Sequence, residues 1–262
     1  FIEQQMSQQP SIALILGSGR GTLADQIESP VKIPYKSIPH FPVSTVAGHA
    51  GQLVLGQLNG KTGVAMQGRV HYYEGYSMQE ITFPVRVMKM LGAGTLIVTS
   101  ACGGLNPKLY PGALMFVTDH VNFMGTNPLI GDNYEELGPR FPDMSGAYNS
   151  ELVVLGKSVS QKLDIETFEG IHTAVTGPYY FSKAELNIVR NFNSDSIGMS
   201  MVPEVIVANH SGMKVMGIAC ITDMATPDLH EPLDHETVVA VANKTRPKFI
   251  KLVSKIVEDI PA

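Results

Sequence analysis

The sequence has little cysteine, no long apolar run and no excess of positive charge. Its 262 residues include two cysteines, Cys102 and Cys220, each among small or apolar neighbours. Two cysteines in a chain of this length do not form a disulfide framework, which favours a reducing compartment, so we expect a cytoplasmic protein. We interpret both as small buried apolar residues rather than as nucleophiles.

No apolar run approaches the roughly 20 residues that cross a membrane, and the first ten residues lack the basic and apolar regions of a signal peptide. The formal net charge is −5 without a basic block, whereas proteins that bind nucleic-acid backbones need a basic face. We therefore expect neither a membrane nor a nucleic acid as partner. An anionic ligand would need a local cluster of donors.

The composition that is present, 44% hydrophobic and 16% charged, is typical of a globular protein. It provides a large core for one α/β domain or two small ones. Because no repeat or Ser/Gly linker interrupts the chain, we expect one domain over residues 1–262. Residues 1–10 would be a trimmed or peripheral N-terminal segment.

Short apolar runs alternate with helical patterns. Strands are predicted at 11–16, 95–99, 113–117, 172–175, 196–198 and 214–222. Helices are predicted at about 77–92, at 150–162, opening within 199–204, and from 235 to about 258. Capping-box patterns begin at Ser77 and Ser182. Asn59-Gly60 between two apolar runs predicts a hairpin, so part of the sheet is antiparallel. Residues 119–140 are predicted to form a long loop.

Arg69 and His71 follow the second strand of this hairpin, with Tyr72, Tyr73 and Tyr76 close behind. Side chains at i and i+2 point the same way on an extended backbone. Such a pair suits a small oxyanion, with aromatic faces nearby for a flat group. The alternative is an arginine and a histidine on a solvated strand end.

A glycine-rich turn, Gly17 to Gly21, follows the first predicted strand. Its backbone N–H groups and the Ser18 hydroxyl can bind a phosphate group, although a plain strand-to-helix turn is equally consistent. The turn matches neither a dinucleotide-binding fingerprint nor a Walker A loop. His49, in a loop flanked by glycines, is a second candidate for a small-molecule contact.

Several polar candidates fall just after predicted strand ends: Ser18, Arg69, Ala101, Ser200 and Asp223. Ligands of open α/β sheets bind at the carboxyl ends of strands, so these positions indicate one site. The Gly17 to Gly21 turn and the segment at Ser200, which can also present a hydroxyl and N–H groups to an anion, indicate phosphate together with Arg69 and His71. Asp223 could hydrogen-bond a heteroaromatic ring. Ser200 could instead be a helix N-cap, and the aromatic run at 179–181 could instead cover the core.

The chain closely resembles the trimeric (low-molecular-mass) purine nucleoside phosphorylases. The resemblance runs from about Ser11 to the end and rests on Gly17-Ser18-Gly19, Gly48-His49-Ala50-Gly51, Gln67-Gly68-Arg69 with His71-Tyr72-Tyr73-Glu74-Gly75, Gly125-Thr126-Asn127-Pro128-Leu129, and Gly198-Met199-Ser200 with Val202-Pro203-Glu204-Val205. It implies an α/β fold with a mixed, distorted β-sheet or barrel core flanked by helices. It also implies phosphorolysis of purine nucleosides to the free base and ribose 1-phosphate.

The resemblance implies roles for individual residues. Phosphate would be held by Ser18, His49, Arg69, His71, Ala101 and Ser200, the ribose by Tyr73, Met199 and His235, and the base by Tyr180, Phe181 and Asp223. Asp223, His71 and Arg69 would be the catalytic residues. No metal or organic cofactor is implied, since inorganic phosphate is a co-substrate. A homotrimer is implied, in which the long loop containing Phe123 would lend an aromatic side chain to the neighbouring subunit.

The departures from the family concern the base. Phe181 replaces a glutamate that reads N1–H of 6-oxopurines, and Asp223 replaces an asparagine that bonds N7 and O6. Met201 and Arg20 also differ from the family. A neutral Asp223 could donate to N7 and accept from a 6-amino group, so we predict selectivity that is weakened or shifted towards 6-aminopurines. Alternatives are a methylthioadenosine or methylthioinosine phosphorylase, a weak purine- or phosphate-binding paralogue and, less favoured, a nucleoside hydrolase.

Overall fold

The chain alternates strands and helices along its length. The computed structural model describes residues 1–17, 21–46, 50–227 and 235–261. The elements are β1 (Ile12–Leu16), β2 (Glu28–Pro34), β3 (Gln52–Leu58), β4 (Lys61–Gln67), α1 (Met78–Met90), β5 (Thr95–Gly104), β6 (Leu114–Asn122), α2 (Ser150–Lys162), β7 (Thr167–Ala174), α3 (Lys183–Asn191), β8 (Ser196–Gly198), α4 (Val202–His210), β9 (Lys214–Met224) and α5 (His235–Asp259). Short 3₁₀ helices lie between them, including Tyr72–Glu74.

The strands of the described residues form one mixed sheet in the order β2-β3-β4-β1-β5-β8-β7-β6-β9. Because β9 also pairs with β5, the last five strands close into a barrel. The pairs β1/β4, β1/β5 and β5/β9 are parallel, whereas the pairs β3/β4, β5/β8 and β6/β9 are antiparallel. The predicted mixed, distorted barrel core flanked by helices is confirmed.

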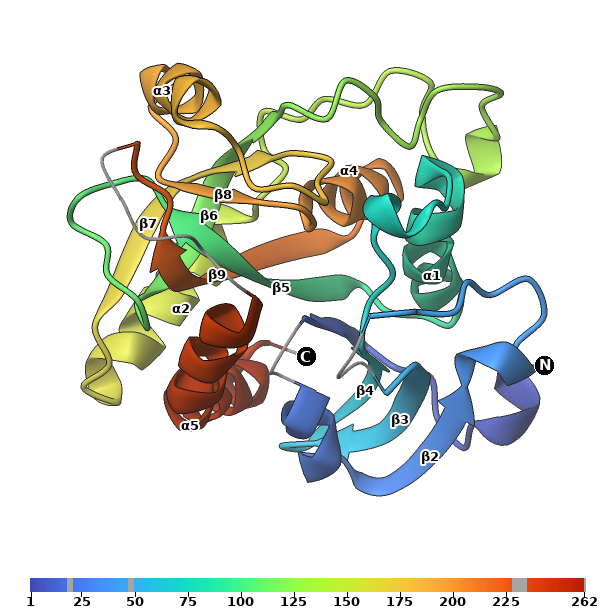
Figure 1. The fold of residues 1–262 in the computed structure, drawn as a ribbon. Helices are drawn as coiled ribbons and strands as arrows, with labels where there is room; N and C mark the ends of the chain where they lie inside the picture. The colour runs from blue at the N-terminus through green and yellow to red at the C-terminus, as the bar shows by residue number, and fades with distance from the viewer. Residues whose placement is uncertain (18–20, 47–49, 228–234, 262) are drawn as a thin grey trace.

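Helices cover the sheet on both sides (Figure 1). Val85 of α1 and Val205 of α4 belong to one buried apolar cluster, which Ile2 of the N-terminal segment also joins. Leu152 of α2 and Leu252 of α5 belong to the cluster on the other side. The sheet is thus the middle layer of the fold, as expected for strands that are apolar on both faces.

The patterns that depend on near neighbours are confirmed. β3 and β4 form the expected hairpin, and the positive φ angles of Asn59 (48°) and Gly60 (78°) suit a tight two-residue turn. Ser77 caps α1 and Ser182 caps α3. In each case the backbone N–H of the serine also donates to the carboxylate of the glutamate three residues later. The predicted helix at 150–162 is α2.

The predicted strand ends are wrong in three places. β5 continues to Gly104, β6 to Asn122 and β9 to Met224, so Ala101 and Asp223 lie within strands rather than just after them. The reason is pairing between distant segments, since β5 and β9 remain hydrogen-bonded past a bulge at Cys102/Gly103. β2 was also not predicted, because it is largely exposed and contains two prolines.

Two further expectations can be compared with the fold. Cys102 and Cys220 are both buried and unbridged, and the Cys102 thiol lies 3.6 Å from the carbonyl oxygen of Cys220. Within the described ranges, no helix combines the length and the apolar character needed to cross a membrane.

Candidate active site

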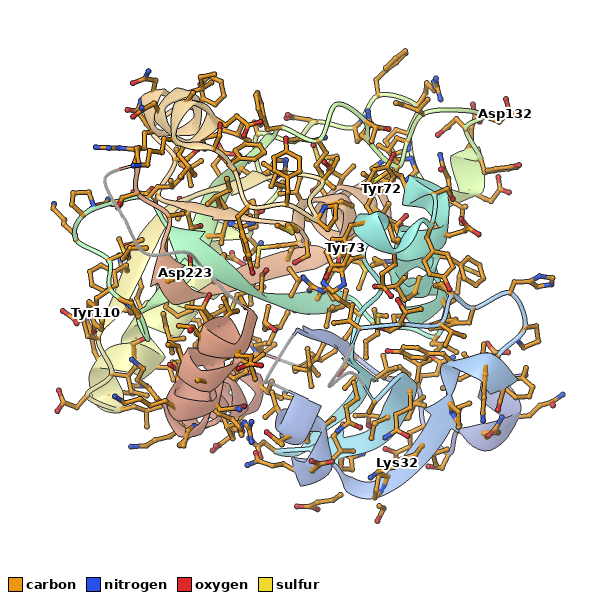
Figure 2. The ribbon with its side chains drawn as sticks, in the orientation of Figure 1. Lys32, Tyr72, Tyr73, Tyr110, Asp132 and Asp223 are labelled. Carbon is orange, nitrogen blue, oxygen red and sulfur yellow. The ribbon has the colours of Figure 1, made fainter. Side chains whose placement is uncertain are left out.

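A cavity of about 300 Å³ lies against the barrel, beside the paired strands β5 and β9. It is lined by His71, Tyr73, Ala101, Cys102, Gly103, Val175, Tyr179, Tyr180, Phe181, Lys183, Leu186, Ile197, Gly198, Met199, Ser200, Thr222, Asp223, Met224, Ala225, Thr226 and Val238. Figure 2 shows Tyr73 near the middle of the molecule and Asp223 to its left, on different parts of the chain. The cavity therefore joins segments that are far apart in the sequence.

His71 forms one end of the cavity. Its backbone N–H donates to Glu74 Oε1 at 2.7 Å, and its ring Nδ1 lies 3.1 Å from the same oxygen. Burial lowers the pKa of His71, although the hydrogen bond to Glu74 opposes this shift. A neutral imidazole that donates through Nδ1 to the carboxylate keeps Nε2 as an acceptor. The His71 ring also stacks on Tyr73, with ring centroids 4.7 Å apart.

Glu74 connects this end of the cavity to Thr45, earlier in the chain. Its Oε2 accepts from the backbone N–H of Thr45 at 2.6 Å and from the Thr45 hydroxyl at 2.7 Å. Burial is the largest influence and raises its pKa, but the hydrogen bonds from His71 and Thr45 together lower the pKa of Glu74 to about 2. Glu74 is therefore an anion that fixes the orientation of His71.

Arg69 is buried, with 1% of its surface exposed. Its Nη2 donates to the carbonyl oxygen of Thr99 at 2.7 Å, and its Nε lies 3.3 Å from Glu204 Oε1 of α4. Arg69 does not line the cavity, but its charge contributes to lowering the pKa of His71. The alternative of a solvated strand end is wrong for both residues, since His71 is only 8% exposed.

Ser200 brings a buried hydroxyl to the same end. Its Oγ lies 2.9 Å from the Oγ of Ser100, which in turn lies 3.1 Å from the carbonyl oxygen of Ala101. Ser200 is not the N-cap of α4, because Met201 occupies that position with φ of 78° and no capping side-chain bond. The Ser200 hydroxyl is therefore directed by β5 rather than by the helix that follows it.

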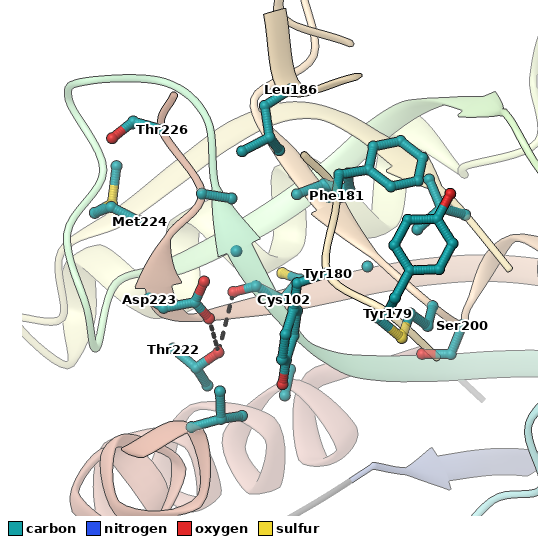
Figure 3. Close-up of a pocket in the computed structure, with 18 of the residues that line it drawn as sticks. Cys102, Tyr179, Tyr180, Phe181, Leu186, Ser200, Thr222, Asp223, Met224 and Thr226 are labelled. Carbon is teal, nitrogen blue, oxygen red and sulfur yellow. Dashed lines mark hydrogen bonds between the residues drawn. The ribbon is translucent and has the colours of Figure 1, made fainter. Parts of the chain in front are cut away.

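Asp223 provides a carboxyl group at the other end (Figure 3). Its Oδ1 lies 2.8 Å from the Thr222 hydroxyl, which also lies 3.3 Å from the carbonyl oxygen of Cys102. Burial raises the pKa of Asp223, and the hydrogen bond from Thr222 partly opposes this shift. Among the described residues that line the cavity, Asp223 is the single carboxylate.

Aromatic side chains form another wall of the cavity. Tyr179, Tyr180 and Phe181 all line the cavity, and Phe181 packs edge-on against Phe123 with ring centroids 6.3 Å apart. Phe123 also contacts Phe192 of the same chain. The aromatic run therefore lines the cavity, and Phe181 also packs on a buried cluster, so both interpretations of this run hold in part.

The cavity brings together most of the predicted residues: His71, Ala101 and Ser200 for phosphate, Tyr73 and Met199 for ribose, and Tyr180, Phe181 and Asp223 for the base. Ser18, Arg20 and His49 lie outside the described residues. His235 is the first residue of α5, and its side chain is outside the description.

Three contributors were not predicted. Glu74 follows His71 in a capping-box spacing that could have identified it. The positions of Glu204 beside Arg69 and of Thr222 beside Asp223 depend on the fold and have no local signal. In the described part of the chain, no three His, Cys, Asp or Glu residues are grouped as they would be around a metal ion.

The barrel, its flanking helices and this cavity agree with one class of protein. The chain belongs to the phosphorylase superfamily, whose model matches residues 11–258.

Within that superfamily the chain is similar to purine nucleoside phosphorylases. It is 57% identical over 257 residues to purine nucleoside phosphorylase 1 of Bacillus subtilis, a match that covers 98% of this chain and 95% of that protein. It is 54% identical to purine nucleoside phosphorylase 1 of Geobacillus stearothermophilus, covering 99% and 95%. The crystal structure of a Schistosoma mansoni purine nucleoside phosphorylase in complex with adenosine is 37% identical, with a TM-score of 0.95, and the match covers 100% of this chain and 95% of that one.

Proposed function

We propose that this chain cleaves the N-glycosidic bond of purine nucleosides with inorganic phosphate, and that its base site favours 6-aminopurines. The cleavage is supported by the family and by relatives of over 50% identity. The base preference rests on one observation: Asp223 is the single carboxylate among the described lining residues and is buried enough to raise its pKa. The same proposal treats the part of the chain that the family model matches as a single domain.

His71, Ser200 and the Ala101 backbone hold phosphate, with Arg69 supplying positive charge from behind. Neutral His71 accepts the O–H of a monohydrogen phosphate at Nε2, because the Glu74 carboxylate fixes the proton on Nδ1. Ser18 and His49 complete the phosphate site. This arrangement fits an anion that must approach C1′ of the sugar, where positive charge develops as the base leaves.

Tyr73, Met199 and His235 hold the ribose between the two ends. Fixing the sugar and phosphate in line contributes about 7–11 kcal/mol for well-oriented partners. A phosphate oxygen forms a bond to C1′ while the C1′–N9 bond breaks and its electron pair passes to the purine. The products are ribose 1-phosphate and the free base, and no metal or organic cofactor takes part.

Asp223 acts on the leaving base, which Tyr180 and Phe181 cover. An ionised carboxylate would repel the negative charge that develops on the purine, whereas the neutral acid donates its proton to N7. The same carboxyl accepts an N–H from a 6-amino group, whereas a 6-oxo group supplies no N–H there. The raised pKa of Asp223 supports this neutral form.

The chain is proposed to act as a homotrimer in the cytoplasm. Besides Phe123, the loop between β6 and α2 carries three exposed bulky side chains, Ile130, Tyr134 and Phe141, of which Phe141 is 89% exposed. Apolar side chains exposed in this way favour an interface with another copy of the chain. Phe123, by contrast, contacts Phe181 and Phe192 of its own chain. The two unbridged cysteines are consistent with a reducing compartment.

A substrate panel tests the proposal. Inosine, guanosine, adenosine and 5′-methylthioadenosine are each incubated with the enzyme, with and without phosphate, and kcat/KM for base release is measured. We expect release that requires phosphate and is faster for adenosine than for inosine. Inosine cleaved far faster than adenosine would overturn the base preference, and release without phosphate would indicate a hydrolase. A clear preference for the methylthio substrate would identify a methylthioadenosine phosphorylase.

A further inference from the structure

Apolar side chains with firm support line the cavity next to Asp223, alongside Thr222 and Thr226. Phe181, Leu186 and Ala225 line the cavity and also pack on a buried cluster that includes Val175 and Ile197. In Figure 3, Leu186 lies above Asp223 and Thr222, and Phe181 lies beside Leu186 on the side of Tyr179. Because these side chains rest on the cluster, they present a fixed apolar surface to any group that extends past Asp223.

The hydrogen-bonding capacity of Asp223 towards a ligand is limited. Thr222 already occupies Oδ1, at 2.8 Å. Oδ2 lies close to the backbone of Gly103. A Cβ added to Gly103 would lie only 3.0 Å from Oδ2 and 2.7 Å from the Cβ of Ala225, so little space is left on this side of the carboxyl. A neutral carboxyl in this position donates one O–H and accepts one further N–H in the plane of the base.

A 6-amino group has two N–H bonds, and Asp223 can accept only one of them. The second points away from N7, towards N1. If N7 faces Asp223, this second N–H lies against the wall of Phe181, Leu186 and Ala225, whose side chains contain no acceptor. A buried donor without a partner is unfavourable, whereas an alkyl group in the same place is favourable.

We propose that the base site accepts 6-aminopurine nucleosides that carry one alkyl group on the exocyclic nitrogen, and prefers them to adenosine. In such bases the alkyl group lies towards N1 and the remaining N–H lies towards N7. The contacts with Asp223 are therefore retained while the alkyl group packs on Phe181 and Leu186. This inference rests on the proposed 6-aminopurine preference and names the substrate class that follows from it.

The expected gain follows from the area buried. One methylene group moved from water to an apolar site is worth about 0.8 kcal/mol, which is about a fourfold change. The kcat/KM of N6-methyladenosine should therefore exceed that of adenosine about fourfold. N6,N6-dimethyladenosine has no N–H for Asp223 and places a methyl group against its carboxyl, so it should be cleaved at least about tenfold more slowly than the monomethyl compound.

Phosphorolysis of adenosine, N6-methyladenosine, N6,N6-dimethyladenosine and inosine by the full-length enzyme tests this order. Adenosine cleaved faster than N6-methyladenosine overturns the inference but leaves the 6-aminopurine preference intact. Equal cleavage of the mono- and dimethyl compounds also overturns it, because the remaining N–H would have no role. Inosine cleaved faster than the other three overturns both proposals.

Two variants locate the effect. Phe181→Glu should lower the ratio of N6-methyladenosine to adenosine cleavage about tenfold, because it places a charged group where the alkyl group packs. Ile188→Glu is the matched control on α3, since Ile188 is exposed and does not line the cavity, and it should leave the ratio unchanged. Leu186→Asn gives an independent reading if Phe181→Glu fails to fold. An unchanged ratio in a folded wall variant overturns the inference.

Discussion

At the His71 end of the cavity, charged and hydroxyl side chains are held by partners on the sheet, on α4 and in the 3₁₀ helix Tyr72–Glu74. At the Asp223 end, a single carboxyl faces aromatic and aliphatic side chains. Arg69 pairs with Glu204, His71 with Glu74, and Ser200 with Ser100. The aromatic wall before α3 is half exposed and rests on a small apolar cluster.

This difference separates two properties of the enzyme. The polar end depends on several mutually dependent contacts, so a single substitution there leaves another buried group uncompensated. The proposed base contacts at the apolar end come from separate side chains. Substitutions at 181 or 223 should therefore change the preferred base without disturbing the proposed phosphate-binding groups.

The largest effect should come from Arg69→Leu. Removing one partner of a buried ion pair leaves Glu204 uncompensated and destabilises the protein by about 3–5 kcal/mol. Loss of the positive charge should lower kcat/KM by about 10²–10³ for every base alike. Thermal unfolding and phosphorolysis of adenosine and inosine measure the two effects.

The double variant Arg69→Leu/Glu204→Leu separates stability from activity. It should recover most of the stability, because no buried charge is left alone, while remaining inactive. Recovery of activity in the double variant would show that Arg69 supports the fold and has no role in binding phosphate.

A smaller and more selective effect is expected for Asp223→Asn. The ratio of adenosine to inosine cleavage should fall by about 10², because a group that matches one hydrogen-bonding pattern rejects the other. The KM for phosphate should stay the same. No change in base preference would contradict the role given to the neutral carboxyl.

Asp223→Asn should also change the pH dependence of adenosine cleavage. Burial raises the pKa of Asp223, so adenosine cleavage should decline as pH rises through that pKa and the acid loses its proton. An asparagine does not titrate, so this decline should be missing in Asp223→Asn. A pH profile of kcat/KM for both proteins makes the comparison.

Glu74→Gln should produce a change in stability that depends on pH. The folded-state pKa of Glu74 is about 2, against an ordinary value of 4.5. The ionised carboxylate therefore stabilises the fold fully above pH 4.5, and this contribution is lost as pH falls towards 2. Unfolding curves should show the largest difference between the two proteins near neutral pH. A difference that persists unchanged at pH 2 would contradict this assignment.

The smallest effect is expected for Ser182→Ala, which removes the N-cap of α3. Losing such a cap costs about 1 kcal/mol and should loosen the aromatic wall that precedes it. The KM for the nucleoside should rise severalfold while the KM for phosphate is unchanged. Ser77→Ala, which removes the same kind of cap from α1, is the control and should change stability without changing either KM.

Features fixed by near neighbours could be predicted from the sequence. The hairpin at Asn59-Gly60 and the caps at Ser77 and Ser182 depend on residues within a few positions of each other. The clustering of His71, Ser200 and Asp223 could also be predicted, because each lies at or near the carboxyl end of a predicted strand.

Features that depend on distant pairing could not be predicted. Nothing near Arg69 indicates that Glu204, 135 positions later, will be its partner. The extensions of β5 through Gly104 and of β9 through Met224 exist because the two strands pair, and each segment alone resembles a loop. Thr222 could not be predicted as the partner of Asp223 for the same reason, because the strand pairing places the Thr222 hydroxyl.

The strand β5 also sets the distance between the two ends of the cavity. Ala101, at the phosphate end, and Gly103, which is paired with Asp223 at the base end, are two residues apart on one extended strand. At about 3.3 Å per residue, this fixes the two ends about 7 Å apart along the strand. Because β5 stays paired with β9 on both sides of the bulge at Cys102/Gly103, side chains at either end can be exchanged while the span between the two ends stays constant.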